Sequence, residues 1–327
     1  MKMLIVVLAL LAAGLLWLLA WPIPELEPVD VHPANVIQYE SFDRVTSAIH
    51  GDNWSPANVS AECRTILLEH GHRTRRAYLF FHGITNCPMQ FMQLGQRLYE
   101  TGANVYIPRL PHHGLSERMT TDLAKLNAQE LADFADHELD LASGLGDTVI
   151  VSGLSLGAVL AIYLAQERGE VHLAVPIAPL LGPKLAPAWA ARPLTRAFLV
   201  LPNRFVWWDS KAKENVPGPK RVYPRFATRA MAETMRLGAL VEARAARRAP
   251  AAGRIVMVTV GGDPAVNNDA NAALVRAWQA RAADRVSAYQ FPESLHLGHD
   301  LIDPDQPYQR VGVVYPILER ILLGQAP

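Results

Sequence analysis

The sequence contains only two cysteines, Cys63 and Cys87, and it carries no net charge, because 31 Lys and Arg residues balance 31 Asp and Glu residues. Two cysteines exclude a disulfide-rich scaffold and a four-cysteine zinc site. A balanced charge argues against a dedicated nucleic-acid-binding protein, which needs a surplus of positive charge to neutralise phosphates. No internal repeat is visible, so we do not expect a solenoid or a propeller.

The chain has both length and apolar content. Its 327 residues are 50% hydrophobic and 19% charged. That length is enough to bury a full core, in one large domain or two small ones. The composition is too apolar for a disordered protein.

The longest apolar run lies at the N-terminus. Residues 3–21 contain neither charge nor proline, and nineteen residues of helix span about 28 Å, close to the hydrocarbon thickness of a bilayer. Lys2 precedes the run and acidic residues follow it, which favours a membrane anchor with the rest of the chain exported to the periplasmic or extracellular side. The alternative is a cleaved signal peptide and a secreted protein. We predict an anchor or signal at 1–21, a tether at 22–61 and a folded domain at 62–327.

Short β-favouring runs alternate with helical patterns through this folded domain. The expected strands are 76–81, 103–108, 148–152, 171–178, 254–260 and 286–291. The expected helices are 88–99, about 128–142 with Asn127 and Glu130 as a capping pair, 156–168, about 269–283 and 311–323. This alternation predicts an α/β fold with a doubly wound, mostly parallel sheet.

A long segment between two of these strands breaks the alternation. Residues 176–250 hold ten of the 24 prolines, and 14 Lys and Arg against 4 Asp and Glu. A structureless loop of that length is improbable in a compact domain, so we predict an inserted cap at about 179–252, with its longest helix at 226–247. Its large apolar side chains would form a pocket: Trp189, Phe198, Phe205, Trp207, Trp208, Phe226, Met231 and Met235. Its arginines either rest on anionic lipid headgroups or coat a solvated helix face.

The sequence Gly153-Leu154-Ser155-Leu156-Gly157 stands between an expected strand and an expected helix. A sharp strand-to-helix turn needs small residues beside the serine, and it holds the hydroxyl clear of the sheet at a helix N-terminus. This context is typical of a nucleophilic serine. The N–H of Leu156 would then stabilise an oxyanion, together with the N–H of Ile84 in the loop that follows the strand 76–81.

A nucleophilic serine needs a base, and the base needs an orienting acid. Asp263 follows the strand 254–260 and is the predicted acid, with Asp269 as the fallback, although Asp269 is expected to cap the next helix. His299 and His296 both follow the last expected strand. We favour His299 as the base and keep His296 as the alternative. A metal site at these histidines lacks a third ligand nearby.

Three further histidines are expected to be structural. His82 lies in the proposed oxyanion loop, where we expect a buried side chain that holds the loop in place. His112 and His113 follow the strand 103–108 and are expected to pack within their loop.

These motifs resemble the α/β-hydrolase superfamily, and within it the bacterial carboxylesterases and monoacylglycerol-lipase-like serine hydrolases. The resembling residues are Phe81 to Thr85, Gly153 to Gly157, Gly262-Asp263 with Val266, and Gly298-His299, within about residues 62–323. The resemblance implies hydrolysis of a small acyl ester through an acyl-enzyme, without a metal or other cofactor. Ser155 argues against the superfamily's dehalogenases and epoxide hydrolases, which use an aspartate there.

Two other functions remain open on the same residues. One is a different acyl transfer, by a thioesterase, amidase or acyltransferase. The other is a catalytically silent hydrolase fold that acts as a binding module.

Cys63 and Cys87 are also open to two interpretations, a disulfide beside the oxyanion loop or two free buried thiols.

Overall fold

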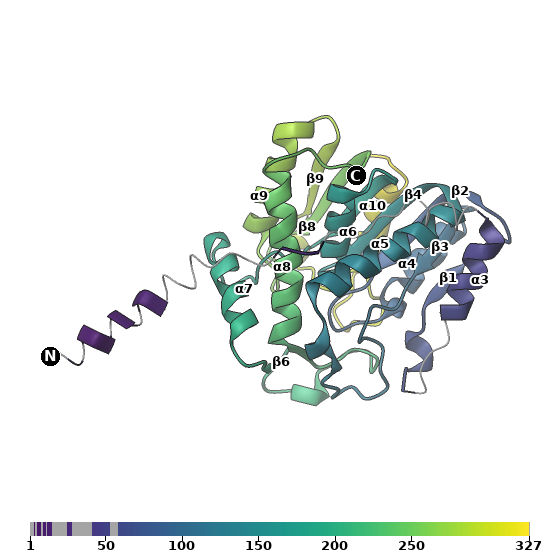
Figure 1. The fold of residues 1–327 in the computed structure, drawn as a ribbon. Coiled ribbons are helices and arrows are strands. Elements are labelled where there is room, and N and C mark those ends of the chain that lie inside the picture. Colours follow the sequence, from purple (N-terminus) through teal and green to yellow (C-terminus); the bar gives the residue numbers. More distant parts are fainter. Residues whose placement is uncertain are drawn as a thin grey trace.

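Seven of the described strands form one twisted sheet in the order β1-β3-β2-β4-β5-β8-β9 (Figure 1). The computed structural model describes residues 3, 5–7, 9–10, 12–14, 25–27, 41–52 and 58–326. The strands of this sheet are β1 (Ile66–Leu68), β2 (Thr74–Phe81), β3 (Asn104–Ile107), β4 (Gly146–Leu154), β5 (Val171–Ile177), β8 (Arg254–Val260) and β9 (Val286–Phe291). All neighbouring pairs are parallel except β1 with β3. The predicted mostly parallel α/β sheet is therefore confirmed.

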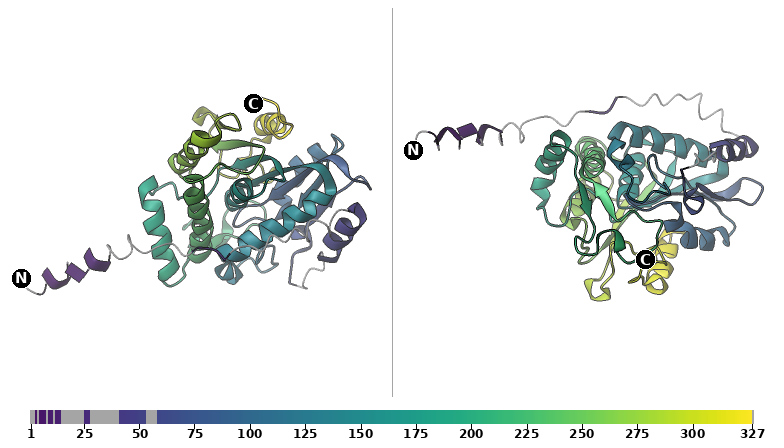
Figure 2. Two further views of the ribbon diagram at one scale, coloured as in Figure 1. Left: turned by 45° about the horizontal axis from the view of Figure 1, so that its top comes forward. Right: turned by 90° about the horizontal axis from the view of Figure 1, so that it is seen from below.

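Helices cover both faces of this sheet. The helices described after residue 40 are α3 (Phe42–Asp52), α4 (Met92–Tyr99), α5 (Ala128–Leu145), α6 (Leu156–Glu167), α7 (Ala191–Val200), α8 (Thr228–Ala245), α9 (Asn268–Ala282) and α10 (Val311–Leu322). Helices α5, α6 and α8 pack side by side, whereas α4 and α10 contact each other. Figure 2 shows α10, in yellow, on the opposite side of the sheet from α8. Helix α6 is apolar all round because the sheet, α5 and α8 enclose it.

The capping prediction for α5 is confirmed. The Asn127 side chain accepts a hydrogen bond from the Glu130 N–H at 2.9 Å. At α9 the prediction is wrong, because Asn267 is the capping residue and accepts from the N–H groups of Asp269 and Ala270. Asp269 lies in the first turn of α9.

Two elements near the N-terminus of the domain are not predicted from the sequence. Strand β1 is only three residues long, and its partner β3 follows only after β2 along the chain. Helix α3 falls inside the predicted tether, yet its Val45 and Ile49 are fully buried and the helix packs against α5. Residues with the spacing of Val45 and Ile49 lie on one face of a helix.

The structure corrects the N-terminal prediction. Residues 15–24 and 28–40, which hold much of the expected anchor and tether, lie outside the described residues. In the described part of the chain, no helix combines the length and apolar composition needed to cross a bilayer, for which about 20 continuous residues are required. The prediction of a transmembrane segment, and of a membrane-anchored protein whose catalytic domain lies on the periplasmic or extracellular side, is therefore wrong.

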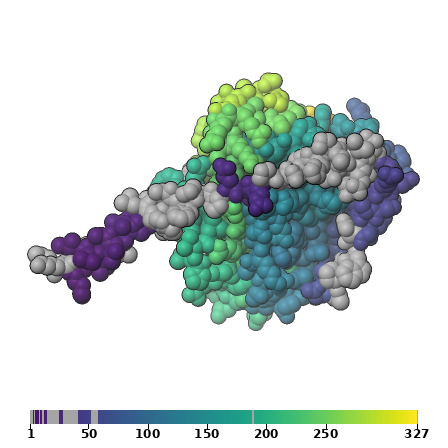
Figure 3. All heavy atoms as spheres, in the orientation of Figure 1, coloured from purple at the N-terminus to yellow at the C-terminus, as the bar shows by residue number. Residues whose placement is uncertain are grey.

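One short piece of the N-terminal region is described against the body of the protein. Residues 25–27 lie across α5 and α8 (Figure 3), where Glu27 N–H donates to Gln129 Oε1 and Arg236 donates to the Glu25 carbonyl. Leu26 is buried at this contact. This contact joins residues 25–27 to two helices of the folded domain.

We predict an inserted cap in the segment between β5 and β8. It holds the 3₁₀ turns η4 (Ala188–Ala190) and η5 (Lys213–Asn215), helices α7 and α8, and a two-stranded sheet of β6 (Phe205–Trp207) and β7 (Arg225–Ala227). The expected long helix at 226–247 is confirmed as α8. Helix α8 packs against α6 as part of the helical layer, so α7 and the β6–β7 sheet form the more separate part. The boundaries at 62, 179 and 252 stay predictions.

Several arginines of this insertion contact acidic or aromatic side chains of the protein. Arg221 pairs with Asp303 and Asp305, and Arg244 and Arg248 pair with Glu167. Arg225 stacks over the rings of Phe205 and Trp207. Paired in this way, these arginines contribute less to the positive charge that a cap resting on lipid headgroups would need.

Cys63 and Cys87 form a disulfide, which settles the choice between a bridge and free thiols. Their Cα atoms are 5.3 Å apart, although 24 positions separate them along the chain. Cys87 directly follows Asn86 of the loop after β2. The bridge therefore fastens the end of this loop to η1 (Ala61–Cys63).

Candidate active site

Ser155 lies between the end of β4 and the start of α6. Its backbone adopts φ 59° and ψ −110°, a conformation that L-residues rarely occupy. The Ser155 N–H donates to the Ile177 carbonyl at 3.0 Å, and its carbonyl accepts from Val159 and Leu180 N–H. Contacts to β5, to α6 and to the loop after β5 therefore hold this strained residue, whose cost is about 1–3 kcal/mol. The turn predicted from the sequence is present in full.

The two glycines of the turn are required by close backbone contacts. A Cβ atom added at Gly157 would lie 2.0 Å from the Phe81 carbonyl oxygen. One added at Gly153 would lie 2.3 Å from backbone atoms of Gly157. Because both obstacles are backbone atoms, no side-chain movement relieves them.

We expect Gly157→Ala to destabilise the fold by more than about 3 kcal/mol, because β2 and α6 would have to separate. Urea unfolding monitored by circular dichroism measures this loss. Gly169→Ala is the matched control, since no atom lies within 4 Å of its added Cβ, and it should change stability by less than about 0.5 kcal/mol. Equal effects of the two substitutions would contradict the steric argument.

The loop after β2 carries the predicted oxyanion donor Ile84. His82 is fully buried beneath it, contacts the Gly83 carbonyl through Nδ1 and accepts the Leu110 N–H at Nε2. Burial lowers the pKa of His82 well below its usual value, and the neighbouring His113 lowers this pKa further. His82 is therefore neutral and holds the loop, as predicted.

The histidine pair after β3 is structural as well. His113 is buried and contacts the carbonyl oxygens of Pro111 at 2.7 Å and of Ile84 at 2.8 Å. Burial lowers the pKa of His113 to about 4, although the two neighbouring carbonyl groups raise it. His112 contacts Glu130. The contact to Ile84 also fixes the carbonyl side of that residue, and with it the direction of the loop.

Asp263 follows β8 and contacts His299. The Asp263 side chain is fully buried, and its Oδ2 lies 2.9 Å from His299 Nδ1. Its Oδ1 accepts N–H groups of Ala265 at 2.7 Å and Val266 at 3.1 Å. Burial on its own would raise the pKa of Asp263, but the His299 bond and charge and the two backbone bonds outweigh it, so this pKa lies below its usual value. Asp263 therefore presents a carboxylate to the His299 ring.

The alternative base lies elsewhere in the same loop. His296 ends the turn η6 (Glu293–Leu295) with φ 46°, and its side chain is exposed. His299 Nδ1 contacts Asp263, whereas in the described residues His296 has no hydrogen bond to a carboxylate. No group of three or more His, Cys, Asp or Glu side chains in the described part of the chain is arranged to hold a metal ion.

Two adjoining cavities open beside Ser155. The larger has a volume of about 540 Å³ and includes the polar side chains of Asn86, Gln90, Gln306 and Tyr308 in its lining. The smaller, of about 200 Å³, is mainly apolar and is lined by Leu180, Phe226 and Met231 among others. Both cavities share the residues Ile84, Ser155, Trp208, Pro264, Ala265 and His299.

The insertion between β5 and β8 thus supplies part of the pocket wall. Trp208, Phe226 and Met231 are the predicted aromatic and methionine residues that reach it. Trp189 is 75% exposed instead, and Met235 is buried in the main core. The Trp208 indole N–H donates to Thr85 Oγ1 at 3.1 Å, so this wall is joined to the oxyanion loop.

The structure thus brings Ser155, His299, Ile84 and Leu156 to one region and joins Asp263 to His299. Leu156 is the first residue of α6, and the first N–H groups of a helix have no partner within it. The polar residues that surround Asp300 were not predicted from the sequence. Asp300 follows His299 directly, which is the one sequence signal that could have drawn attention to it.

Comparison with known proteins agrees with this geometry. Residues 66–312 match the model of the alpha/beta hydrolase family, so the chain belongs to that family. Over 105 residues it is 30% identical to the thermostable monoacylglycerol lipase of Bacillus sp. (strain H-257), an alignment that covers 30% of this chain and 38% of that relative.

Solved structures share the fold. A monoacylglycerol lipase from Paleococcus ferrophilus superposes with a TM-score of 0.59 at 14% identity, covering 80% of this chain and 98% of that one. A soluble variant of monoglyceride lipase from Saccharomyces cerevisiae gives a TM-score of 0.58 at 13% identity, covering 81% and 91%. At these identities the likeness concerns the fold alone.

Proposed function

We propose that the protein is a serine hydrolase of carboxylic esters, with Ser155 as nucleophile, His299 as base and Asp263 as the orienting acid. The observation that carries the proposal is the 2.9 Å contact between His299 Nδ1 and Asp263 Oδ2, made by a histidine that lines the same two cavities as Ser155. Family membership and the lipases among its relatives support a hydrolase of the lipase and esterase kind.

The mechanism follows from the hydrogen bonds. With the Nδ1 proton donated to Asp263, the His299 ring has Nε2 free to accept the Ser155 proton as the hydroxyl attacks the ester carbonyl. The N–H groups of Ile84 and Leu156 stabilise the negative charge on the carbonyl oxygen. The alcohol leaves with the proton from His299, and a water molecule then releases the acid from Ser155 by the same steps.

The two cavities suggest how an ester would lie. The smaller, apolar cavity suits the acyl chain, and the larger cavity with amide side chains suits a polar alcohol. Such an ester matches the lipases named above. Thioesters, amides and acyl acceptors other than water would use the same three residues, so a substrate panel distinguishes these alternatives.

The test is covalent labelling with a fluorophosphonate. We expect one adduct in the intact mass of the parent protein and none on Ser155→Ala, because only an activated serine reacts with this probe. Hydrolysis of p-nitrophenyl esters should be lost in the same variant. A folded parent that takes no adduct would contradict the proposal and favour a catalytically silent binding module.

A further inference from the structure

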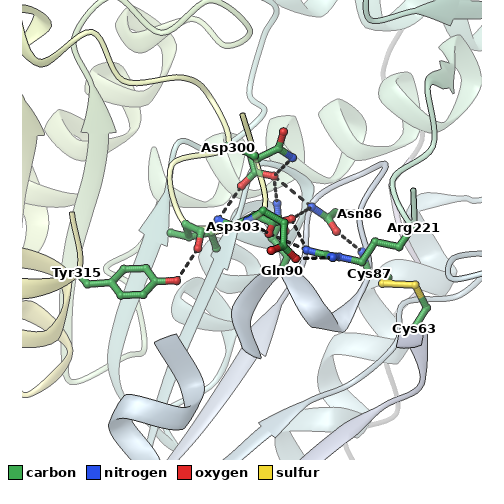
Figure 4. A network of polar contacts seen from close by, with 11 residues as sticks. Cys63, Asn86, Cys87, Gln90, Arg221, Asp300, Asp303 and Tyr315 are labelled. Atoms are coloured by element: carbon green, nitrogen blue, oxygen red, sulfur yellow. Dashed lines mark hydrogen bonds and ion pairs between the residues drawn. A yellow bond between two sulfur atoms is a disulfide. The ribbon is translucent and has the colours of Figure 1, made fainter. Parts of the chain in front are cut away.

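The carboxyl group of Asp300 joins several loops at the floor of the larger cavity (Figure 4). Its Oδ2 accepts hydrogen bonds from three side-chain amides: Gln90 Nε2 at 2.9 Å, Asn86 Nδ2 at 3.1 Å and Gln306 Nε2 at 3.1 Å. Its Oδ1 accepts the Asp303 N–H at 3.3 Å. One carboxylate oxygen thus gathers donors from the oxyanion loop, from η2 (Pro88–Phe91) and from the loop after His299.

Gln90 carries this contact to the oxyanion loop. It is 2% exposed, and its Oε1 accepts the Gly83 N–H at 2.8 Å. A side-chain amide has one accepting end and one donating end. Since the Gly83 N–H only donates, Gln90 turns its oxygen toward Gly83 and its nitrogen toward Asp300 Oδ2. The contact with Asp300 therefore orients the side chain that holds the Gly83 N–H, one peptide before the Ile84 N–H.

The other side of the network is anchored by an ion pair. Asn86 Nδ2 also donates to Asp303 Oδ2 at 3.2 Å, and Arg221 donates to both oxygens of Asp303 at 2.7 and 2.8 Å. Arg221 is 8% exposed and comes from the insertion between β5 and β8. Asn86 Oδ1 accepts the Cys87 N–H, which ties the network to the disulfide. These contacts hold Asn86, another of the donors to Asp300 Oδ2, in place.

We propose that Asp300 and Gln90 are positioning residues that lock the oxyanion loop and the His299 loop into one register. The inference rests on the proposed function, because it assigns the Ile84 N–H to the oxyanion and His299 to proton transfer. Neither Asp300 nor Gln90 needs to touch the reacting atoms. Their effect on catalysis acts through Gly83, which precedes Ile84, on one side and through His299, which precedes Asp300, on the other.

This arrangement makes the acceptor at position 300 critical. In Asp300→Leu, the oxygen that accepts the three amides is removed, and the Gln90 nitrogen loses its partner. Gln90 is then no longer held with its oxygen toward the Gly83 N–H. Because removal of a whole oxyanion donor costs about 10²–10³ in kcat, we expect a displaced donor to cost about 10- to 100-fold in kcat, with KM changed by less than about threefold.

The decisive experiment removes both partners. Gln90→Met removes the bonds to Gly83 and Asp300 at similar volume and should lower kcat as well. In the double variant Gln90→Met with Asp300→Leu, we expect kcat within about threefold of the lower single variant, because both side chains act on the same Gly83 N–H. Gln90→Glu should also lower kcat, since it places two carboxylates face to face. Gln90→Met alone tests the inference if Asp300→Leu does not fold.

The readout separates positioning from a structural role. Active sites are titrated with the fluorophosphonate, and kcat is expressed per titrated site with a p-nitrophenyl ester. Gln166→Glu is the matched control, because Gln166 is a buried glutamine that bridges Trp278 Nε1 and the Ala249 carbonyl at the far end of α6. It should lower thermal stability and leave kcat per site within about twofold.

The outcomes are distinct. A parent that neither labels nor hydrolyses esters would overturn the proposed function and this inference with it. A parent that is active, with Asp300→Leu and Gln90→Met each within about twofold of its kcat per site, would overturn the inference alone. So would a double variant in which the two losses simply multiply.

Discussion

Replacing His299 by asparagine is expected to lower kcat by about 10⁴- to 10⁶-fold. Asparagine can still contact Asp263, which His299 Nδ1 approaches to 2.9 Å, but it offers no basic nitrogen to accept the Ser155 proton. An unassisted serine hydroxyl is a poor nucleophile, so acylation should nearly stop. Steady-state hydrolysis of a p-nitrophenyl ester and the rate of fluorophosphonate labelling measure the loss independently.

His296→Asn is the matched control for this experiment. His296 occupies the left-handed region at φ 46°, where asparagine is tolerated better than most residues, so the backbone should be kept. We expect kcat within about tenfold of the parent. A larger loss in His296→Asn than in His299→Asn would make His296 the base and would contradict the geometry around Asp263.

Asp263→Asn should lower kcat by about 10⁴-fold while the fold is retained. The new amide would keep an oxygen toward the N–H groups of Ala265 and Val266, which Asp263 Oδ1 now accepts. Its nitrogen would then face His299 Nδ1. The ring would have to carry its proton on Nε2, the atom that must accept from Ser155, so the wrong tautomer would be selected.

The pH dependence of stability provides a second measurement on the same variant. Although burial opposes it, hydrogen bonds from His299 and two backbone N–H groups hold the pKa of Asp263 below its usual value of 3.8. A depressed carboxyl pKa stabilises the fold above the pKa of the unfolded chain, and this stabilisation is lost as pH falls through the folded pKa. The free energy of unfolding of the parent should therefore exceed that of Asp263→Asn at pH 7.

The two unfolding curves should converge as the pH is lowered below about 3.8. Urea denaturation of both proteins at a series of pH values checks this expectation. A stability difference that stays constant down to about pH 3 would show that the loss in the variant comes from packing and not from the charge of Asp263.

Local sequence determined much of this protein. The turn Gly153 to Gly157 was predictable because only glycine fits where a Cβ would meet backbone atoms within 2.3 Å. The Asn127 cap, helix α8 and most strands followed from patterns that act over a few residues. Asp263 was predictable because parallel strands place their carboxyl ends at one edge of the sheet. At the N-terminus, apolar composition alone gave the wrong prediction of a membrane anchor.

The tertiary structure alone decided which side chains meet across long stretches of chain. The sequence favours His299 but keeps His296 as an alternative, and only the path of the loop brings His299 to Asp263, 36 positions away. The pairing of Cys63 with Cys87 and the contact of Arg221 with Asp303 arise in the same way. Such contacts depend on how whole elements pack, and no local pattern encodes the direction in which a distant amide or guanidinium group arrives.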